Sequence, residues 1–513
     1  MTDNDLSPRE RAVVEAGVEW VDENADVLVA LLSDLVARPS MAGNEGTIDE
    51  PESTVGHLWE FLEDHIDHAE LESQQITLDD GSSGDENAEL ASNSCDNLYA
   101  TLSGRGDGAL LCTSHTDIVS PGDSGGWPAD DPFDMTEGIA RRVEPGFLEV
   151  EADGRTERRE IRDRMDRIWE RRKSDEQPVL IGRGVYDNKA SIVCLVGSLL
   201  ALETGLTKRN ETLGGDLIHG HLVDEEVYQI GVKEMVGWGD RNGWLGDRLD
   251  KATDVAGVVL EGSYGFVPVI GHRGLVWVTL EATGESAHAS TPELGRNAVL
   301  GTAQALSAMD ESVEETITAR FLDDPMLGSP TVAAGTTIVG EGIRNVENGT
   351  INRNGLNSIP SWCETTFDIR IPRWEGFPDG VEAIRNDLVD VIEDAATSAV
   401  SEIDFAATIG DDDFFPPVAL GSTVEDARTH PLIETASAST YSTLGYEPTI
   451  ETAPGVTDAA FLYHGTHAPT LVEYGPAGAW SHEPWEFVER DQVVDGAKTM
   501  LEVAVRHLGV TEQ

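Results

Sequence analysis

The chain has 513 residues, and its 39% of apolar residues together with 52 Gly allow sizeable cores, which excludes wholesale disorder and indicates roughly two to four domains. Its 95 Asp and Glu residues against 35 Lys and Arg residues give a formal net charge of −60. A surface this acidic repels nucleic-acid phosphates and anionic lipids, so we expect neither nucleic acid nor a membrane as a partner.

Residues 1–271 alternate between helix-like and strand-like patterns. The expected helices are Val27–Leu35 and Ser191–Leu202, and the expected strands are 109–114, 179–181, 217–223 and 255–260. This alternation predicts an α/β domain with a mostly parallel sheet. Within it, Arg141–Lys173 holds 11 of the 35 basic residues, and its mixed-charge part, Thr156–Lys173, favours a solvated helix over an anion-binding patch.

A different order of elements occupies residues 272–421. Strands are expected at 275–282, 334–340, 362–371 and 404–409, and helices at 297–309 and 380–396. This β-α-β-β-α-β order is that of the ferredoxin-like split βαβ sandwich. Residues 422–513 are again helical at 429–444 and 491–508 with a strand at 469–474, so residues 1–271 and 422–513 form one domain and 272–421 is inserted into it.

The four cysteines are widely spaced, and we expect buried free thiols. Met1–Glu15 has no apolar core of a signal peptide, and the longest apolar stretch, around Ile192–Leu202, is too short to span a bilayer. We therefore expect a cytoplasmic protein.

Polar side chains follow the strands of the predicted α/β sheet. In chain order they are His115, Asp117, Asp187, Glu225, Glu226 and Glu261. Acid pairs alone carry no information in so acidic a chain, but ligands of open α/β sheets bind beyond the carboxyl ends of the strands. We therefore expect these side chains to converge.

Imidazole and carboxylate ligands without a thiolate favour a pair of divalent ions, Zn²⁺ first and Co²⁺ or Mn²⁺ as alternatives. Two such ions are neutralised by the carboxylates of Asp187, Glu226 and Glu261 with one hydroxide. Asp117 is placed to accept the other imidazole N–H of His115 and to fix its tautomer.

Nine motifs resemble, in family order, those of the M20 metallopeptidases and deacylases, which include acetylornithine deacetylase, succinyl-diaminopimelate desuccinylase, aminoacylase-1 and glutamate carboxypeptidase. The motifs are Ser-His-Thr-Asp (114–117), Gly-Arg-Gly-Val-Tyr-Asp-Asn-Lys (182–189), Asp-Glu-Glu (224–226), Leu-Glu-Gly (260–262), the stretch 285–298, Asn-Ser-Ile-Pro (357–360), Asp-Ile-Arg (368–370), Gly-Val-Thr-Asp-Ala (455–459) and Ser-His-Glu-Pro (481–484).

The resemblance implies a role for each matching residue. His115, Asp187 and Glu261 would hold one metal ion, and Asp187, Glu226 and His482 the other. Glu225 would be the general base that acts on the bridging water, and Asp117, beside His115, is counted among the catalytic residues. His288 would reach across a homodimer to polarise the scissile carbonyl, so the inserted domain would serve dimerisation and as a lid. Asn357 and Arg370 match positions that contact the carboxylate end of the substrate, although Arg370 could also pair with a neighbouring acid.

The resemblance also has departures. Ala190 stands where the family commonly has Gly, and about 40 residues, 137–179, are additional and leave the substrate specificity open. His219, His221, His464 and His467 are interpreted as structural.

The function expected from these features is hydrolysis of the amide bond of an N-acyl amino acid or small peptide with a free carboxylate. Glu261, and not Asp, occupies this ligand position, which resembles the deacylase and carboxypeptidase branches more than the di- and tripeptidases. Two alternatives stay open: hydrolysis of a non-peptide C–N bond such as a ureide, and a homologue without catalysis. No phosphate-binding Gly-rich loop of the form G-x-G-x-x-G or G-x-x-x-x-G-K-[ST] occurs.

The acid excess also predicts a salt-rich environment. Only six of the 35 basic residues are Lys, and at molar salt the Debye length falls to about 3 Å, which screens repulsion between carboxylates. In both respects the chain resembles proteins of halophilic archaea.

Overall fold

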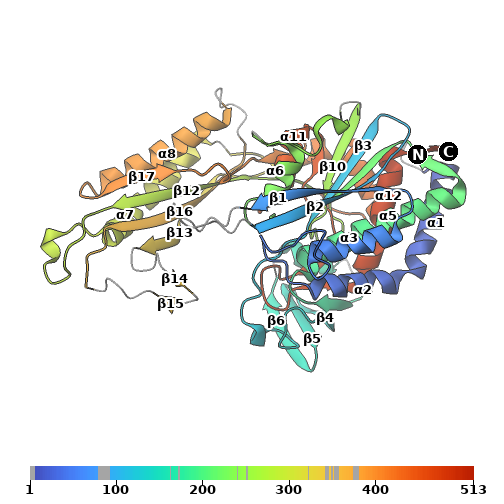
Figure 1. Cartoon of the computed structure of the whole chain (residues 1–513), viewed down its shortest axis with the longest axis horizontal. Helices are drawn as coiled ribbons and strands as arrows, with labels where there is room; N and C mark the ends of the chain where they lie inside the picture. Colours follow the sequence, from blue (N-terminus) through green and yellow to red (C-terminus); the bar gives the residue numbers. More distant parts are fainter. Residues whose placement is uncertain are drawn as a thin grey trace. The chain divides into compact units, whose positions relative to one another are not determined.

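The computed structural model describes residues 6–78, 93–161, 163–170, 174–239, 241–249, 252–321, 323–340, 346–347, 350–351, 357–373 and 380–513. The chain forms two compact units (Figure 1). The first comprises Met1–Ile270, Thr423–Ala453 and Thr457–Gln513, and the second comprises Gly271–Ser422 with Pro454–Val456.

A six-stranded sheet with the order β1-β2-β9-β3-β10-β21 lies at the centre of the first unit. Its strands, in this order, are Glu70–Leu78, Asn93–Leu102, Gly215–Leu222, Gly108–His115, Asp254–Val259 and Thr470–Leu471. The pairs from β9 to β21 are parallel, and β1 and β2 add an antiparallel edge. Strand β3 is buried over Ala109–His115, as expected for a parallel strand covered on both faces. The mostly parallel α/β sheet is confirmed.

Helices pack around this sheet. They are α1 (Pro8–Glu23), α2 (Ala25–Val36), α3 (Thr54–His65), α5 (Ala190–Arg209), α6 (Ile230–Val236), α9 (Val424–Arg428), α10 (Pro431–Leu444), α11 (Ala459–Thr466) and α12 (Arg490–Leu508). Residues Val185–Arg209, which include α5, are long and apolar enough to cross a membrane, but 89% of the apolar window is buried inside the protein. Gly197 allows close packing there, because a Cβ at this position would lie 2.8 Å from Ala497 Cβ. Helix α5 is a core helix.

The segment with many basic residues forms much of a second, antiparallel sheet of the first unit, with the order β22-β23-β7-β4-β5-β6. These strands are Gly478–Ala479, Phe487–Glu489, Glu176–Ile181, Thr136–Glu144, Phe147–Ala152 and Arg155–Glu160. The helix expected over Thr156–Lys173 is therefore wrong over its first residues, which pair with β5; only α4, Asp163–Glu170, is helical. Residues 162 and 171–173 lie outside the described residues. Half-buried and exposed side chains alternate along most of β6, as expected for a strand with one face towards solvent.

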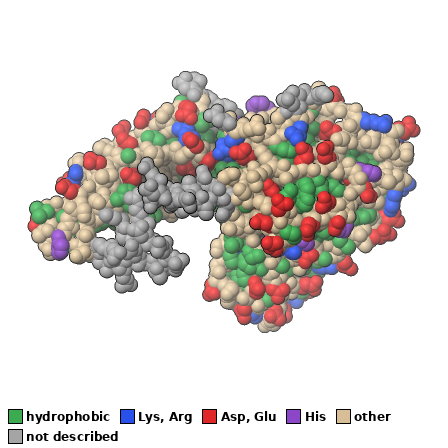
Figure 2. All heavy atoms as spheres, in the orientation of Figure 1, with side chains coloured by type: hydrophobic (Ala, Val, Ile, Leu, Met, Phe, Trp, Pro, Cys, Tyr) green, Lys and Arg blue, Asp and Glu red, His purple; other side chains and the backbone are tan. Residues whose placement is uncertain are grey.

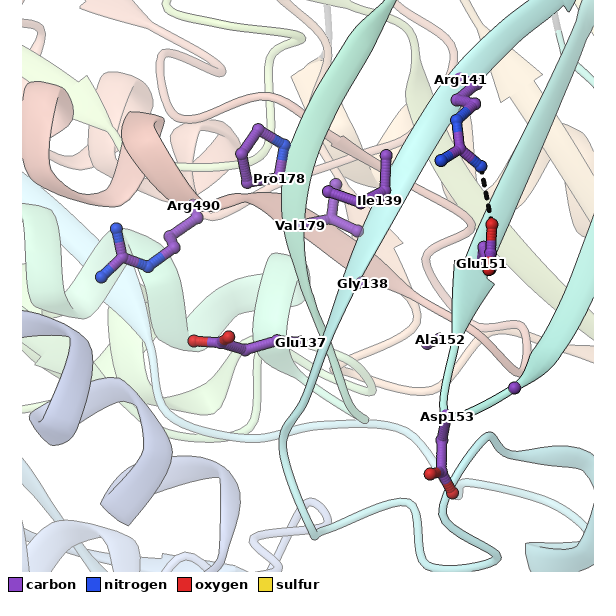
Figure 3. Close-up of a pocket in the computed structure, with 11 residues that line it drawn as sticks. Glu137, Gly138, Ile139, Arg141, Glu151, Ala152, Asp153, Pro178, Val179 and Arg490 are labelled. Atoms are coloured by element: carbon purple, nitrogen blue, oxygen red, sulfur yellow. Dashed lines mark hydrogen bonds and ion pairs between the residues drawn. The ribbon is translucent and has the colours of Figure 1, made fainter.

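Arginines of this segment face carboxylates. Arg141 contacts Glu151 at 2.8 Å (Figure 3) and Glu176 at 2.7 Å, and Arg142 binds Asp166 with two nitrogens. In the hollow drawn in Figure 3, Glu137 and Asp153 add further negative charge. The preference for a solvated, ion-paired surface over an anion-binding patch is supported, because the described guanidinium groups already have anionic partners.

The second unit contains the expected split βαβ sandwich. Its elements in chain order are β12 (Gly274–Thr283), α7 (Ala298–Arg320), β13 (Thr331–Gly340), β16 (Trp362–Ile371), α8 (Gly380–Ala399) and β17 (Asp404–Thr408). The strand order β13-β16-β12-β17 is antiparallel throughout, and α7 and α8 close one apolar core with the sheet. Strand β13, which has a bulge between Ala334 and Thr337, lies at one end of this order.

Short elements complete the chain. They are β8 (Glu211–Leu213), β11 (Val269–His272), β14 (Val346–Glu347), β15 (Thr350–Ile351), β18 (Phe414–Phe415), β19 (Val418–Ala419), β20 (Glu451–Ala453) and β24 (Val510–Glu512). All four cysteines are buried and free, as predicted.

Candidate metal centre

Three polar segments lie where the parallel strands of the first sheet end. His115 is the last residue of β3, Glu225 and Glu226 follow β9, and Glu261 follows β10. Asp187 follows β7, which belongs to the antiparallel sheet, so the expectation of one common sheet is wrong for this residue. The apolar run 179–181 identifies a strand but carries no information about its neighbours. The parallel-strand sheet and the antiparallel sheet thus both contribute to one site.

Five side chains form two groups that share Asp187. In the first, His115 Nε2 lies 3.2 Å from Asp187 Oδ1 and 3.2 Å from Glu261 Oε1. In the second, His482 Nε2 lies 3.3 Å from Asp187 Oδ2 and 3.0 Å from Glu226 Oε2. Each oxygen of Asp187 therefore faces a different histidine, which is the arrangement of a bridging carboxylate.

The donor atoms of these groups fit two divalent cations. Within each group they lie within 4.8 Å of one another. Glu226 Oε1 is buried and has no hydrogen-bond partner among the described residues, so it can serve as a further ligand atom. Burial also differs across the site: the side chain of His115 is 1% exposed and that of His482 is 54% exposed. In the chain by itself, the second group is the one open to solvent.

Asp117 connects the metal ligands with the segment of the expected base. Its Oδ1 lies 3.2 Å from His115 Nδ1, which directs Nε2 of the same ring towards the first group. Its two carboxylate oxygens also accept hydrogen bonds from the backbone N–H groups of Glu225 and Glu226, at 3.0 and 2.9 Å. One fully buried carboxylate thus orients a ligand histidine and fixes the turn after β9.

Glu225 lies beside both groups without belonging to either of them. Burial raises the pKa of its carboxyl well above the usual range, and the nearby carboxylates of Glu261 and Asp458 add to this shift. Gln229 Nε2 donates a hydrogen bond of 3.0 Å to Glu225 Oε1. A half-buried carboxyl that is oriented and not committed to a cation suits proton transfer.

The ionisation of the ligands follows from their contacts. Burial lowers the pKa of His115, but Glu261, Asp117 and Asp187 outweigh it and raise this pKa well above 6.5. Hydrogen bonds to Asp187 and Glu226 raise the pKa of His482 to about 10. Burial raises the pKa of Asp187, but His115 and His482 reverse the effect and lower it below the ordinary value. The electrostatic attraction between the two imidazoles and the surrounding carboxylates is therefore strong, and these are the groups that would bind the cations.

Residues 164–506 match the model of peptidase family M20/M25/M40, which is more than half of the chain. The chain belongs to this family. Succinyl-diaminopimelate desuccinylase of Methylobacterium radiotolerans is 26% identical over 394 residues, 76% of this chain and 79% of the relative. The enzyme of the same name from Paracoccus denitrificans is 24% identical over 418 residues, 80% of this chain and 86% of the relative.

Solved structures share the M20 fold with this chain. Human carnosine dipeptidase 1 has a TM-score of 0.61 at 15% identity, covering 96% of this chain and 99% of its own. The M20 family metallo-carboxypeptidase Sso-CP2 from Sulfolobus solfataricus has a TM-score of 0.59 at 15% identity, covering 94% of this chain and 99% of its own. This M20 chain is a metallohydrolase that acts on the amide bond of an acyl amino acid or a peptide.

Sequence reasoning missed a buried ion pair beneath the ligands of this M20 site. The Glu486 carboxylate contacts the Arg183 guanidinium and accepts hydrogen bonds from the backbone N–H groups of Gly184, Tyr186 and Asp187, at 3.2, 3.0 and 3.0 Å. Glu486 therefore ties the segment that carries His482 to the one that carries Asp187. In the sequence, only the position of Glu486, four residues after His482, could have indicated this role. Acids are too frequent in this chain for that spacing to be recognised.

Two further buried acids were missed. Glu45 Oε1 accepts a hydrogen bond of 3.0 Å from Asp224 N, next to the expected base, and burial raises its pKa to about 8. Asp458, which belongs to the motif 455–459, is 1% exposed, and burial raises its pKa well above the usual range. The motif identified the position of Asp458, but no residue pattern indicated its burial.

The residues expected to act on the substrate lie in the second unit. The backbone N–H of Ala289 donates to the carbonyl of Asn357 at 2.6 Å, so His288 and Asn357 are on neighbouring segments. The His288 side chain is exposed and lies 2.8 Å from Ser290 Oγ through Nδ1. Arg370 forms a two-nitrogen ion pair with Asp368 at 2.6 and 2.9 Å, which is the alternative weighed for it. The substrate roles of His288, Asn357 and Arg370 stay predictions.

The histidines interpreted as structural have no part in the two ligand groups. His219 and His221 are buried on β9, and burial lowers their pKa values to about 3 and about 4, so both are neutral in the folded protein. His221 Nδ1 lies 3.0 Å from Ser114 Oγ. His464 stacks edge-on against Trp238, and His467 ends α11 in a left-handed conformation.

Proposed function

We propose that the protein is a dinuclear deacylase that removes the acyl group from an N-acyl amino acid with a free carboxylate. The observation that carries the proposal is the pair of three-ligand groups sharing Asp187, with the Glu225 carboxyl beside them and outside both groups. Such an arrangement serves to activate water against an amide carbonyl.

Each residue of the site has one task in this reaction. Two divalent ions, Zn²⁺ first by the ligand types, would polarise the carbonyl and lower the pKa of the attacking water towards about 7. Glu225 accepts a proton from this water while the water oxygen bonds to the carbonyl carbon. When the C–N bond breaks, Glu225 returns the proton to the leaving amine. Asp117 holds the turn that carries Glu225, so that the base stays aimed at the water.

The acyl amino acid is favoured over a peptide for two reasons. The curated relatives named above are desuccinylases, which are named for removing an acyl group. The terminal ligand of the first group is a glutamate, Glu261, and not an aspartate. In this respect the chain resembles the deacylase and carboxypeptidase branches of the family. The resemblance assigns the carboxylate of such a substrate to Asn357 and Arg370, and Arg370 would have to give up its ion pair with Asp368 to bind it.

A substrate panel tests the proposal. The protein is stripped with a chelator, reloaded with Zn²⁺, Co²⁺ or Mn²⁺ in molar KCl, and assayed on N-succinyl, N-acetyl and N-carbamoyl amino acids and on dipeptides. We expect no turnover after chelation, recovery on reloading, and the highest kcat/KM with N-acyl amino acids. Turnover confined to N-carbamoyl substrates would favour the ureide alternative, and turnover of none would favour the homologue without catalysis.

We also propose that each active site is completed by His288 of a second subunit in a homodimer. An oxyanion donor of this kind is worth roughly 10²–10³ in kcat. His288→Ala and Glu225→Gln are therefore both expected to be nearly inactive. After subunit exchange, half of the dimers are mixed and one of their two sites has both residues, so activity should return to roughly a quarter of wild type. No recovery, with exchange verified by mass spectrometry, would place His288 in the active site of its own subunit. Activity of His288→Ala near wild type would place His288 outside the reaction.

A further inference from the structure

The loop between β22 and β23 carries the exposed ligand His482, and its backbone is held in an unfavourable conformation. Trp480, His482 and Trp485 have φ values of 63°, 65° and 66°. Residues other than Gly rarely adopt this left-handed backbone conformation, and they keep it only where the surrounding structure imposes it. Since the His482 side chain is 54% exposed, its own packing cannot impose it. Neighbouring groups must therefore hold this loop.

On one side the loop is held by the buried Glu486 and Arg183 described above. Arg183 also donates to the carbonyl of Glu483 through Nη2, at 3.4 Å. These contacts fix the residues that follow His482, but they leave Trp480, before it, without an anchor of this kind.

On the other side the loop meets the additional segment 137–179. Arg159 of β6 places its guanidinium carbon 4.8 Å from the centroid of the Trp480 ring. Its Nη1 donates to Glu483 Oε2 at 2.7 Å, and its Nε donates to Glu157 Oε1 at 2.8 Å, which orients the guanidinium plane. Arg159 thus contacts the loop both before and after His482.

A second arginine of β6 supports the other tryptophan of the loop. Arg155 has its guanidinium carbon 5.9 Å from the Trp485 ring and donates to the carbonyl of Gly125 at 3.3 Å. The Trp485 indole N–H in turn donates to the carbonyl of Gly126 at 2.8 Å. Both tryptophans also belong to the apolar core of the antiparallel sheet.

We propose that the additional segment is part of the metal centre and that Arg159 is its positioning residue, holding the loop so that His482 faces Asp187 and Glu226. The proposal rests on the metal site proposed above. It assigns to residues 137–179 a role in retaining the second metal ion, where the sequence left their contribution open.

The chain offers a matched control in the preceding residue. Arg158 lies on the same strand, has its guanidinium carbon 5.1 Å from the Phe147 ring and is paired with Glu144. It therefore makes the same two kinds of contact without touching the loop of His482. Arg159→Met and Arg158→Met remove equivalent interactions, and only the first should affect the metal.

The test is a Co²⁺ titration of the stripped protein in molar KCl, followed by visible absorption and by competition with a chelator. His482→Ala identifies the absorption band of the ion held by His482. For Arg159→Met we expect this second ion to bind about tenfold more weakly, the first to bind as in wild type, and kcat to fall at subsaturating metal with KM unchanged. Arg159→Lys, which can keep the ion pair with Glu483, should lie between Arg159→Met and wild type.

The outcomes separate this inference from the proposed function. If the wild-type protein binds no pair of ions, the proposed function fails. If it binds two and Arg159→Met matches Arg158→Met in both affinities, the positioning role is wrong. Equal weakening of both ions, or a rise in KM alone, would also overturn it, since these results indicate a general loss of fold or a substrate contact.

Discussion

Replacement of Glu225 by Gln is expected to lower kcat by roughly 10²–10⁴-fold while both metal ions stay bound. Glu225 belongs to neither ligand group, and its backbone N–H bond to Asp117 does not depend on the side chain. Gln has the same shape but cannot accept the proton of the attacking water. The measurements are kcat and KM with the best substrate of the panel, and metal content by atomic spectroscopy.

A buried glutamate outside both ligand groups provides the control for this substitution. Glu203 of α5 is 4% exposed and accepts backbone hydrogen bonds from Asp67, His68 and Ala69, at 3.0, 2.8 and 2.6 Å. Glu203→Gln should lower stability but leave kcat near wild type. If Glu225→Gln kept its activity within about threefold, another group would have to be the base, since a positioned base contributes more than this.

Sequence reasoning worked best where a residue pattern and a place in the fold coincide. His115, Glu226 and Glu261 could be found because each follows an apolar run that forms a parallel strand, and parallel strands end at one edge of a sheet. Asp187 was also expected after an apolar run, but in the wrong sheet, and His482 could be found only through the resemblance of its motif. The strands that precede them, β7 and β22, belong to the antiparallel sheet, whose pairing depends on long-range contacts that no local pattern encodes.

The buried acids show where sequence reasoning reaches its limit. Glu486 and Glu45 decide the positions of Asp187 and Asp224, yet in sequence they look like any of the 95 acids. Whether a carboxyl is buried depends on the segments that cover it, and these lie 299 and 179 residues away along the chain. The helix expected at Thr156–Lys173 failed for a related reason: mixed charges suit any solvated element, and pairing with β5 selected the strand.

The net charge of the molecule leads to a second prediction with a large expected effect, on stability. Thirty-five Lys and Arg residues can neutralise only part of 95 acids, so a formal charge of −60 stays on the protein even when every cation is paired. Figure 2 shows Asp and Glu side chains over the visible face of the molecule, with few Lys or Arg between them. Repulsion among such carboxylates opposes the compact state wherever salt does not screen it. The folded state should therefore depend on salt more strongly than on any single side chain.

Dilution from molar KCl to below roughly 0.1 M lengthens the Debye length from about 3 to about 10 Å, which brings neighbouring surface carboxylates within range of one another. We expect unfolding or dissociation at low salt, recovery in molar KCl, and a Tm difference of at least about 10 °C, which corresponds to several kcal/mol for domains of this size. The measurements are thermal melts by circular dichroism and light scattering across a KCl series. Sucrose is the control, because it strengthens apolar burial without screening charge. If sucrose at low salt restored the same Tm, or if the Tm were equal at both salt limits, repulsion between carboxylates would not be what controls the stability of this protein.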